Sequence, residues 1–333
     1  MVRVAINGFG RIGRMIFRAA YARKDINIVA VNDLGSTDAL AYLLKYDSVH
    51  GEFKEDVAAG SGKMKVGSRV LSVLAQKDPS MLPWKELKVD IVLECTGLFL
   101  SEEKASMHIK AGAGKVILSA PAKDHGAIKT IVMGVNENTI DKSDKIVSNA
   151  SCTTNCLAPL MKILDDAYSI QSGFMTTVHA VTSTQGLLDG INEKDYRRGR
   201  SALLNMLPTT TGAAKSIGTV LPHLDGRLDG MAVRVPLADG SLTDATVTVK
   251  KIVTSEGINM LFKKKAKEMK EIVQYTETPI VSSDIVGNSH SCIIDGTFTK
   301  ANGNLIKVLA WYDNEWGYSN RMVDLVEYIS RLK

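Results

Sequence analysis

The chain has 333 residues and a formal net charge of +5, with 41 Lys and Arg against 36 Asp and Glu. This length predicts two domains at roughly 100–200 residues each, and no basic tail or nucleic-acid motif accompanies the mild positive charge, so nucleic-acid binding is not expected as the primary role. Four cysteines are too few for a disulfide scaffold of this length. No apolar run approaches the roughly 20 residues of a membrane helix, and residues 2–7 predict a strand rather than a secretion signal. We therefore expect a cytoplasmic protein without a membrane partner.

The chain begins with a predicted strand, VRVAIN at residues 2–7, which ends at the glycine-rich NGFGRIG. Helical spacing of apolar residues follows over 11–22, and NIVAVN at 27–32 predicts a second strand. Strand, glycine turn, helix and strand within about thirty residues predict a βαβ unit.

The alternation of strands and helices continues to about residue 150. Helices are expected after Ser36 or Thr37 and over 101–111, and strands over 89–95, 115–119 and 130–135. Such alternation predicts a mostly parallel sheet covered on both faces. We expect an α/β domain over 1–150, a Rossmann-type doubly wound parallel sheet that binds a dinucleotide.

The pattern changes near residue 150. A helix is expected over 151–166, followed by longer strands over 171–181, 231–236, 241–251 and 305–313 and one clear long helix over 257–273. These elements predict an α+β catalytic domain over 151–316 with a mostly antiparallel sheet. A last helix is expected over 317–331, and we expect the segment 317–333 to pack back on the first domain.

Gly8, Gly10 and Gly13 form the pattern G-x-G-x-x-G between the first strand and the first helix. The first glycine allows a tight turn, the second allows the backbone to approach a pyrophosphate, and the third allows close packing of helix and strand. Asp33 ends the next strand, where a carboxylate can hold the ribose hydroxyl of NAD and repel the extra phosphate of NADP. The alternative is an ordinary structural turn with a solvated aspartate.

Cys152 lies in SNASCTTNCLAP at the expected start of a helix. The free N–H groups of a helix N-terminus stabilise a thiolate, so we expect a lowered pKa and a reactive thiol there. The alternative for Cys152 is a buried, inert cysteine. Cys156 lies one turn further on, and we interpret it as a small buried residue because no His or Cys partners stand at zinc spacing.

His179 lies in GFMTTVHAVTST, an apolar strand that ends in hydroxyl residues. It could activate Cys152 as the base of a Cys–His pair, or it could be a core histidine, because the sequence alone does not place the two residues together. We expect no metal site.

Taken in order, INGFGRIGR, SNASCTTNCLAP, TTVHAVT, LPTTTGAAK, GMAVRVP and WYDNEWGYSNR resemble the glyceraldehyde-3-phosphate dehydrogenase family over essentially the whole chain. The resemblance implies a phosphorylating, NAD-dependent glycolytic oxidoreductase that is a homotetramer. It implies that Cys152 attacks the aldehyde carbon to form a thiohemiacetal, and that His179 activates it. Hydride transfer to the nicotinamide then leaves a thioester, which inorganic phosphate attacks to release 1,3-bisphosphoglycerate.

The resemblance also implies the binding residues. Contacts to NAD, beside those of the glycine turn, are implied for Arg11, Ile12, Asp33, Lys77, Ser119 and Asn314. Binding of the C3 phosphate of glyceraldehyde 3-phosphate is implied for Thr182 and Arg234 with help from Arg197, and binding of inorganic phosphate for Ser151, Thr153, Thr211 and Gly212. These are suitable donors for phosphate.

Two positions depart from the family pattern. Ile191 follows Gly190 where the family often has proline, in a loop that helps to set cofactor choice and subunit contact, and Lys77 stands where the family often has arginine. Lysine lacks the planar fork of arginine, so weaker stacking on adenine is expected. One alternative function is an erythrose-4-phosphate dehydrogenase, against which TTTGAAK argues because it resembles the phosphate-binding stretch of the phosphorylating enzymes. A non-catalytic binding protein with the same fold is the other.

Overall fold

The computed structural model describes residues 1–124, 126–193 and 195–332. The chain divides into two compact units. The first contains Met1–Ile131, Glu137–Ser151 and Ser319–Lys333, and the second contains Val132–Asn136 and Cys152–Tyr318. Helix α7 (Trp316–Arg331) begins in the second unit, and from Ser319 onward it belongs to the first.

The first unit is built on a nine-stranded sheet with the order β3-β4-β5-β2-β1-β6-β7-β9-β8. The pairs from β5 to β8 are parallel, whereas the β3–β4 and β4–β5 pairs are antiparallel. The chain order reverses between β1 and β6, which is where doubly wound sheets bind ligands. The strands are β1 (Val2–Asn7), β2 (Ile26–Asn32), β3 (Val57–Gly60), β4 (Lys63–Val66), β5 (Arg69–Leu74), β6 (Ile91–Glu94), β7 (Lys115–Leu118), β8 (Lys129–Thr130) and β9 (Ile146–Ser148).

Two of the three long helices described in this unit begin at serine caps, whereas the first begins at a glycine. The helices are α1 (Arg11–Tyr21), α2 (Thr37–Lys45), α3 (Glu102–Lys110) and the short η1 (Pro79–Met81) and η2 (Glu137–Thr139). The side chains of Ser36 and Ser101 accept backbone N–H bonds at the starts of α2 and α3, which satisfies donors that a helix start leaves unpaired. Gly112 takes a φ of +102° just after α3, a conformation that ends many helices.

The second unit is a seven-stranded sheet with the order β11-β12-β10-β13-β16-β15-β14. Only the β10–β12 and β14–β15 pairs are parallel. Its long strands are β10 (Ile170–His179), β12 (Leu228–Arg234), β13 (Ser241–Val249), β15 (Cys292–Asn302) and β16 (Leu305–Tyr312), and its short strands are β11 (Leu207–Thr210) and β14 (Val273–Thr276).

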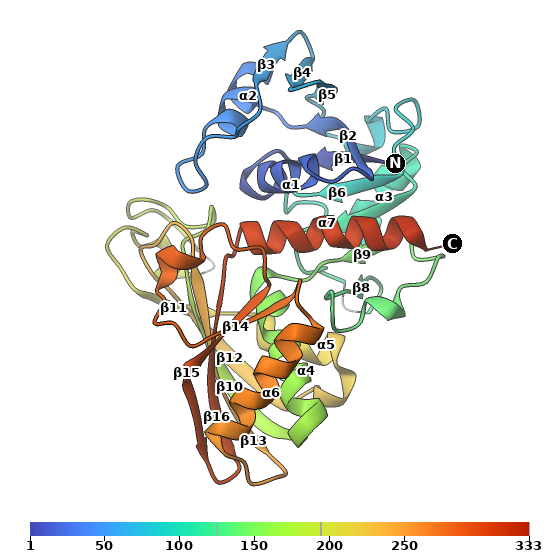
Figure 1. The fold of residues 1–333 in the computed structure, drawn as a ribbon. Helices are drawn as coiled ribbons and strands as arrows, with labels where there is room; N and C mark the ends of the chain where they lie inside the picture. Colours follow the sequence, from blue (N-terminus) through green and yellow to red (C-terminus); the bar gives the residue numbers. More distant parts are fainter. Residues whose placement is uncertain (125, 194, 333) are drawn as a thin grey trace. The chain divides into compact units, whose positions relative to one another are not determined.

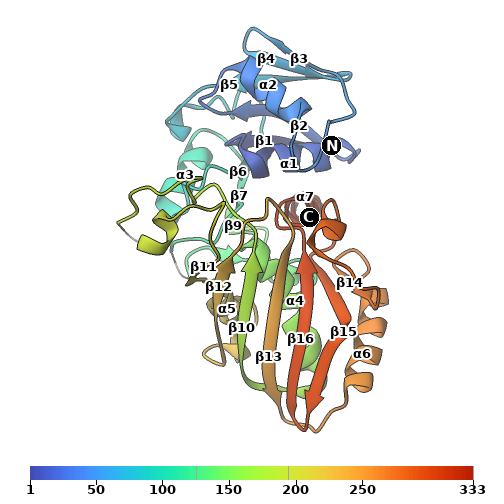
Figure 2. The ribbon, with the colours of Figure 1, turned by 90° about the vertical axis from the view of Figure 1, so that its left-hand side faces the viewer.

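Helices α4 (Cys152–Tyr168), α5 (Ala213–Val220) and α6 (Ser255–Glu268) cover one face of this sheet (Figures 1 and 2). Burial alternates along β13, as expected for a sheet with one covered face. The short helices η3 (Tyr196–Gly199), η4 (Pro222–Leu224) and η5 (Ser282–Ile285) connect these elements. The two sheets together confirm the predicted fold class.

One predicted strand is wrong, and several elements were not predicted. Residues 130–135 were expected to be extended, but β8 stops at Thr130 and a turn with Gly134 at a φ of +80° follows. The apolar residues Ile131 and Val132 are fully buried without being in a strand, so burial in a turn produced the strand-like pattern. The unpredicted strands β3, β4 and β9 have only three or four residues each, too short to show a clear period. The longer strands β5 and β15 were also not predicted, and in β15 the first five residues are all buried, so burial does not alternate there.

Candidate active site

The glycine turn joins β1 to α1, and its three glycines meet different steric demands. Gly8 has a φ of +92°, and a Cβ there would lie 2.7 Å from the backbone nitrogen of Thr96. A Cβ on Gly13 would overlap the carbonyl oxygen of Gly8, whereas a Cβ on Gly10 would meet nothing within 4 Å. Gly10 is also the N-cap of α1 and makes no side-chain capping bond. Open space at an uncapped helix start fits the pyrophosphate of a dinucleotide.

Asp33 lies directly after β2 and is tied to the glycine turn. Its Oδ2 accepts a hydrogen bond from the backbone N–H of Phe9 at 2.8 Å, and its Oδ1 accepts one from that of Gly35 at 3.1 Å. These bonds hold the carboxylate at the end of the strand. Lys77 is exposed in the segment after β5, and Ser119 follows β7. All these positions follow the carboxyl ends of parallel strands, the edge at which such sheets bind ligands.

A cysteine and a histidine lie together in the second unit. Cys152 is the first residue of α4 and His179 is the last residue of β10. The distance from Cys152 Sγ to His179 Nε2 is 3.4 Å. This is the geometry expected of a nucleophile and its base, and it brings together two residues that the sequence could not place.

A buried tyrosine holds this pair in place. The hydroxyl of Tyr312 lies 2.9 Å from the Thr153 hydroxyl and 2.8 Å from the Thr177 hydroxyl, so it links the start of α4 to β10. Its ring packs edge-on against the His179 ring, with 5.9 Å between the centroids. Tyr312 is 1% exposed. The relative positions of Cys152 and His179 therefore depend on packing in the core of this unit.

The protonation of the pair differs from the sequence-based expectation. Burial raises the pKa of the Cys152 thiol to about 11, although the positive charge of Arg234 and hydrogen bonds from Thr153 act in the opposite direction. Burial and the charge of Arg234 lower the pKa of His179 to about 3. The expected lowering of the thiol pKa is therefore wrong for this structure, because desolvation outweighs the helix start. The resting pair is a neutral thiol beside a neutral imidazole.

The other ring nitrogen of His179 has two neighbours. Nδ1 lies 2.7 Å from the carbonyl oxygen of Ala180, which can only accept a hydrogen bond. A proton on Nδ1 leaves Nε2 as an acceptor facing the thiol. Nη1 of Arg234 lies 2.5 Å from the same Nδ1 and 3.0 Å from the Ala180 oxygen. The guanidinium can only donate, so it requires a lone pair on Nδ1, whereas the carbonyl requires a proton there.

Arginine and hydroxyl groups gather around Arg234. Arg234 pairs with His179 in the β10–β12 register, and burial lowers its pKa, with a further small lowering from the charge of Arg198. Arg198 Nε donates to the Thr209 hydroxyl at 3.0 Å on the neighbouring strand β11. The charge of Arg198 acts on Arg234, and an anion bound beside Arg234 would offset this repulsion.

The predicted anion-binding residues differ in their exposure and in their hydrogen bonds. Arg197 is exposed on η3, whereas its neighbour Arg198, which we did not predict, lies near Arg234. No sequence signal distinguishes two adjacent arginines, so Arg198 was missed. The Thr182 hydroxyl lies 2.9 Å from that of Thr184, and Thr211 and Gly212 lie at the start of α5, where Thr211 Oγ1 accepts from the N–H of Ala213 at 3.2 Å.

The remaining predicted residues are divided between the two units. Asn314 belongs to the second unit, is 6% exposed and accepts a hydrogen bond from the Ser241 hydroxyl at 2.6 Å. Arg11, Ile12 and Ser151 belong to the first unit. The Arg11 guanidinium forms an ion pair with Asp47 at 2.6 Å.

The fold and the site define a class of protein: an oxidoreductase with one dinucleotide-binding unit and a second unit that carries a cysteine–histidine pair. Comparison with known proteins agrees. Residues 2–102 match the NAD-binding domain of glyceraldehyde 3-phosphate dehydrogenase, and residues 151–314 match the C-terminal domain of the same family.

Relatives with the same description cover nearly the whole chain. The chain is 52% identical over 327 residues to glyceraldehyde-3-phosphate dehydrogenase 1 of Streptomyces avermitilis, covering 97% of each chain. It is also 52% identical over 338 residues to the Mycobacterium avium enzyme, covering 99% of each. With enzyme 2 of Bacillus subtilis it shares 50% identity over 332 residues, covering 99% of this chain and 97% of the relative.

The chain belongs to the glyceraldehyde-3-phosphate dehydrogenase family. It is an NAD-dependent oxidoreductase of glycolysis, as predicted. Among the residues that the structure describes, no helix has the length and apolar character needed to cross a membrane.

Proposed function

We propose that this enzyme oxidises glyceraldehyde 3-phosphate to 1,3-bisphosphoglycerate through a covalent intermediate on Cys152. The observation that carries the proposal is the 3.4 Å separation between Cys152 Sγ and His179 Nε2 at the start of α4. A neutral thiol is a weak nucleophile, so a base within hydrogen-bonding reach is what makes the thiol useful.

In the proposed mechanism, His179 Nε2 takes the thiol proton as Sγ bonds to the aldehyde carbon. The carbonyl electron pair moves to oxygen, and the imidazolium returns its proton to that oxygen to complete a thiohemiacetal. NAD, when bound, supplies the acceptor for the hydride that leaves this carbon. His179 removes the hydroxyl proton again as the thioester forms. An oxygen of inorganic phosphate then attacks the thioester, and Cys152 leaves as thiolate.

The groups around Arg234 support a binding site for the substrate phosphate. We assign the C3 phosphate to Arg234 and Thr182 with Arg197, and we add Arg198 because it lies near Arg234. A phosphate bound there would draw the guanidinium away from His179 Nδ1 and leave that nitrogen to donate to Ala180. Inorganic phosphate is assigned to Ser151, Thr153, Thr211 and Gly212.

The geometry of the first unit supports the assignment of the cofactor residues. The uncapped start of α1 and the space at Gly10 suit the pyrophosphate, and Asp33 suits the adenosine ribose. The full proposed set is Gly8, Gly10, Arg11, Ile12, Gly13, Asp33, Lys77, Ser119 and Asn314.

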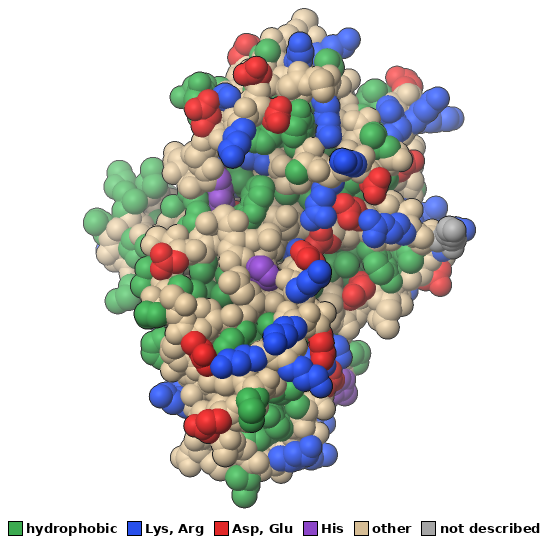
Figure 3. All heavy atoms as spheres, in the orientation of Figure 1, with side chains coloured by type: hydrophobic (Ala, Val, Ile, Leu, Met, Phe, Trp, Pro, Cys, Tyr) green, Lys and Arg blue, Asp and Glu red, His purple; other side chains and the backbone are tan. Residues whose placement is uncertain are grey.

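Exposed apolar side chains support a homotetramer as the working form. Leu187, Leu188, Ile191, Leu204 and Met206 are between 68% and 95% exposed. Figure 3 shows hydrophobic side chains gathered at the left edge of the molecule, where Figure 1 draws the yellow-green segment that contains these residues. An apolar segment of this kind is typical of a surface that contacts another chain. We place the assembled enzyme in the cytoplasm.

The decisive assay is NADH formation from glyceraldehyde 3-phosphate with and without inorganic phosphate. We expect sustained turnover only with phosphate, and none from Cys152→Ser. His179→Asn should slow both turnover and iodoacetamide labelling of Cys152, by about 10²–10⁴-fold for a lost general base. Cys156, which is fully buried, is the internal control and should label slowly in every variant.

Two results would contradict the proposal. Turnover by the Cys152→Ser enzyme would exclude Cys152 as the nucleophile. A loss of activity of less than about tenfold in His179→Asn would show that the role of this histidine is structural. Phosphate-independent turnover that is faster with erythrose 4-phosphate would favour the alternative, an erythrose-4-phosphate dehydrogenase that hydrolyses its thioester.

A further inference from the structure

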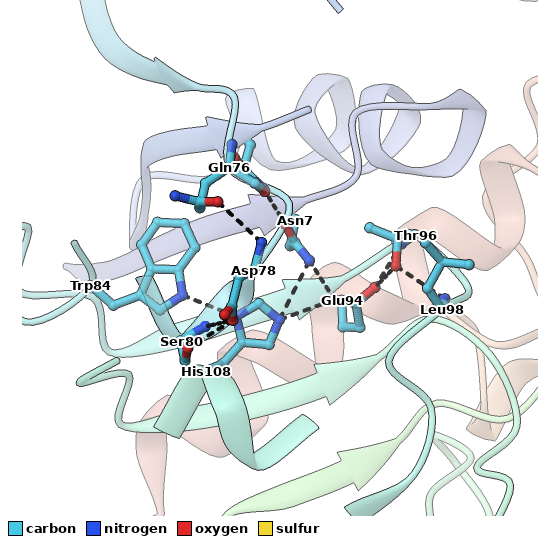
Figure 4. A network of polar contacts seen from close by, with 10 residues as sticks. Asn7, Gln76, Asp78, Ser80, Trp84, Glu94, Thr96, Leu98 and His108 are labelled. Atoms are coloured by element: carbon cyan, nitrogen blue, oxygen red, sulfur yellow. Dashed lines mark hydrogen bonds and ion pairs between the residues drawn. The ribbon is translucent and has the colours of Figure 1, made fainter. Parts of the chain in front are cut away.

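A network of buried polar side chains lies behind the glycine turn in the first unit (Figure 4). Its centre is Glu94, the last residue of β6, which is 0% exposed. Four hydrogen bonds reach its carboxylate. Asn7 Nδ2 donates at 2.6 Å, His108 Nε2 lies at 3.0 Å, and the Thr96 backbone N–H donates at 2.7 Å, with the Thr96 hydroxyl as the fourth donor.

The position of the proton on His108 follows from its partners. The indole Nε1–H of Trp84 can only donate, and it lies 3.0 Å from His108 Nδ1. Nδ1 therefore accepts and carries no proton, so the proton is on Nε2 and points at Glu94. Every partner of the Glu94 carboxylate is therefore a donor. Hydrogen bonds to a buried carboxylate are stronger than those between neutral groups.

The network continues from Glu94 to the ends of two further strands. Asn7 ends β1, and its Oδ1 accepts from Asn32 Nδ2 at 2.7 Å; Asn32 ends β2. Asn32 exchanges two hydrogen bonds with the backbone of Gln76, at 2.9 Å and 2.8 Å. The segments that follow these residues begin at Gly8, Asp33 and Lys77. Three segments proposed to bind NAD thus start at residues joined to one carboxylate.

We infer that Glu94 and His108 form a positioning pair that fixes the glycine turn, Asp33 and Lys77 relative to one another for NAD binding. Neither side chain touches the cofactor in this inference. Both act by fixing Asn7 and, through it, Asn32. The inference rests on the proposed assignment of those three segments to NAD. Side chains that support a binding site in this way set its geometry, and small displacements are costly.

The test is the Kd for NAD in Glu94→Gln, measured without aldehyde or phosphate. Glutamine has the same shape as glutamate, but its NH₂ group would face one of the hydrogen-bond donors that surround Glu94. Two donors cannot form a hydrogen bond with each other, so one bond is lost. Losing one charge-assisted bond should raise the Kd by roughly ten- to a hundredfold. At saturating NAD we expect the kcat and the KM for the aldehyde to stay close to wild type, because the Cys152 site is in the other unit.

A matched control separates positioning from stability. Val116→Ala shortens a buried side chain in the core cluster that also contains Trp84. It substitutes neither Glu94 nor any of its hydrogen-bond partners. It should lower the unfolding midpoint and change the Kd for NAD less than about twofold. A Glu94→Gln enzyme with a wild-type Kd, or a Val116→Ala enzyme with as large a rise in Kd, would overturn the inference.

If the Glu94→Gln chain does not fold, a second pair of variants tests the same inference. His108→Gln keeps an amide that can donate to Glu94, whereas His108→Leu does not, so only the leucine variant should bind NAD more weakly. Equal Kd values in the two would overturn the inference. A wild-type protein that binds no NAD would overturn the assignment of the three segments, and the inference with it.

Discussion

At the scale of single residues, burial sets the chemistry of the reactive pair more than the helix end does. The thiol of Cys152 and the imidazole of His179 are both held in their neutral forms. A proton passed between them creates two opposite charges side by side without changing the net charge of the buried site. The attraction between these two charges offsets part of the cost of moving the proton from a thiol of raised pKa to an imidazole of lowered pKa.

At the same scale, we propose that Asp33 sets the choice of cofactor. Its carboxylate is fixed by the N–H groups of Phe9 and Gly35, so it cannot turn away from a bound ribose without losing both bonds. The extra phosphate of NADP carries about −1.5 to −2 charges at neutral pH, and like charges brought together cost several kcal/mol. Leu34, Gly35, Ser36 and Thr37 follow and provide no compensating cation.

We expect Asp33→Ala to raise the relative use of NADP, chiefly through a lower KM for NADP. The measurement is kcat/KM for both cofactors in wild type and variant. Asp38→Ala, in the first turn of α2, is the control for loss of a nearby charge and should leave the preference for NAD unchanged. A wild type that already uses NADP as well as NAD would transfer the choice of cofactor to the loop at Ile191, which is 95% exposed.

At the scale of elements, a pair of buried carboxyl groups lies where β16 leads into α7. The Asp313 carboxylate accepts hydrogen bonds from the N–H groups of Trp316 at 2.6 Å and Gly287 at 2.7 Å. Asp239 is 6% exposed, and burial together with the adjacent Asp313 raises its pKa to about 9. At neutral pH Asp239 is protonated and donates to Asp313, which remains the acceptor for the start of α7.

This raised pKa makes stability depend on pH. Between the ordinary aspartate pKa near 4 and the folded value of about 9, the folded chain holds a proton that the unfolded chain releases. Stability from this group is therefore greatest in acid and falls as the pH rises through that window, with a slope of up to about 1.4 kcal/mol per pH unit. Above the folded pKa it makes no further contribution to the slope.

Asp239→Asn should remove this slope, because an asparagine amide donates to Asp313 without a proton to lose. We expect the variant to match wild type near pH 5 and to be more stable near pH 8, as measured by urea-unfolding midpoints. Asp229→Asn is the control. This aspartate is exposed, and like Asp239 it accepts a hydrogen bond from the N–H of the residue that follows it. An Asp239→Asn profile that runs parallel to wild type across this range would mean that Asp239 is already ionised in the folded protein.

At the scale of the whole molecule, the exposed apolar segment from Leu187 to Met206 is the surface that we propose for assembly. Its apolar side chains are exposed to water, and burying apolar surface stabilises a protein by about 25 cal/mol per Å². A homotetramer in which this segment contacts a neighbouring chain would cover them. The same segment contains Arg198, so the proposed contact between chains and the proposed anion-binding groups share one stretch of chain.

We expect wild type to sediment with the mass of four chains and Leu204→Asp to shift towards smaller species. Leu204 is 81% exposed, and a charge there would have to be buried in a contact between chains. Met260→Asp, at a 67% exposed position on α6, is the matched control and should leave the mass unchanged. A Leu204→Asp protein that remains a tetramer would exclude this segment from the contact.

The sequence by itself determined the local features of this protein. The glycine turn, the helix that begins at Cys152 and most of the long strands are encoded within a few residues, because capping, steric fit at glycine and the period of burial depend on near neighbours. The family resemblance, carried by motifs such as SNASCTTNCLAP, supplied the function. The period failed at residues 130–135, where apolar residues are buried in a turn, and in strands of three or four residues. It also failed in β15, where the first five residues are all buried and burial does not alternate.

Only the tertiary structure decided which distant residues meet. Cys152 and His179 are separated by 27 positions, and their contact depends on how α4 packs on β10. The register of β12 against β10 places Arg234 beside His179, and the fold of η3 brings the charge of Arg198 within range of Arg234. The Glu94 network joins β1, β2, β6 and α3. Such contacts, and the burial that shifts the pKa values of Cys152 and Asp239, depend on packing between segments, which no local pattern encodes.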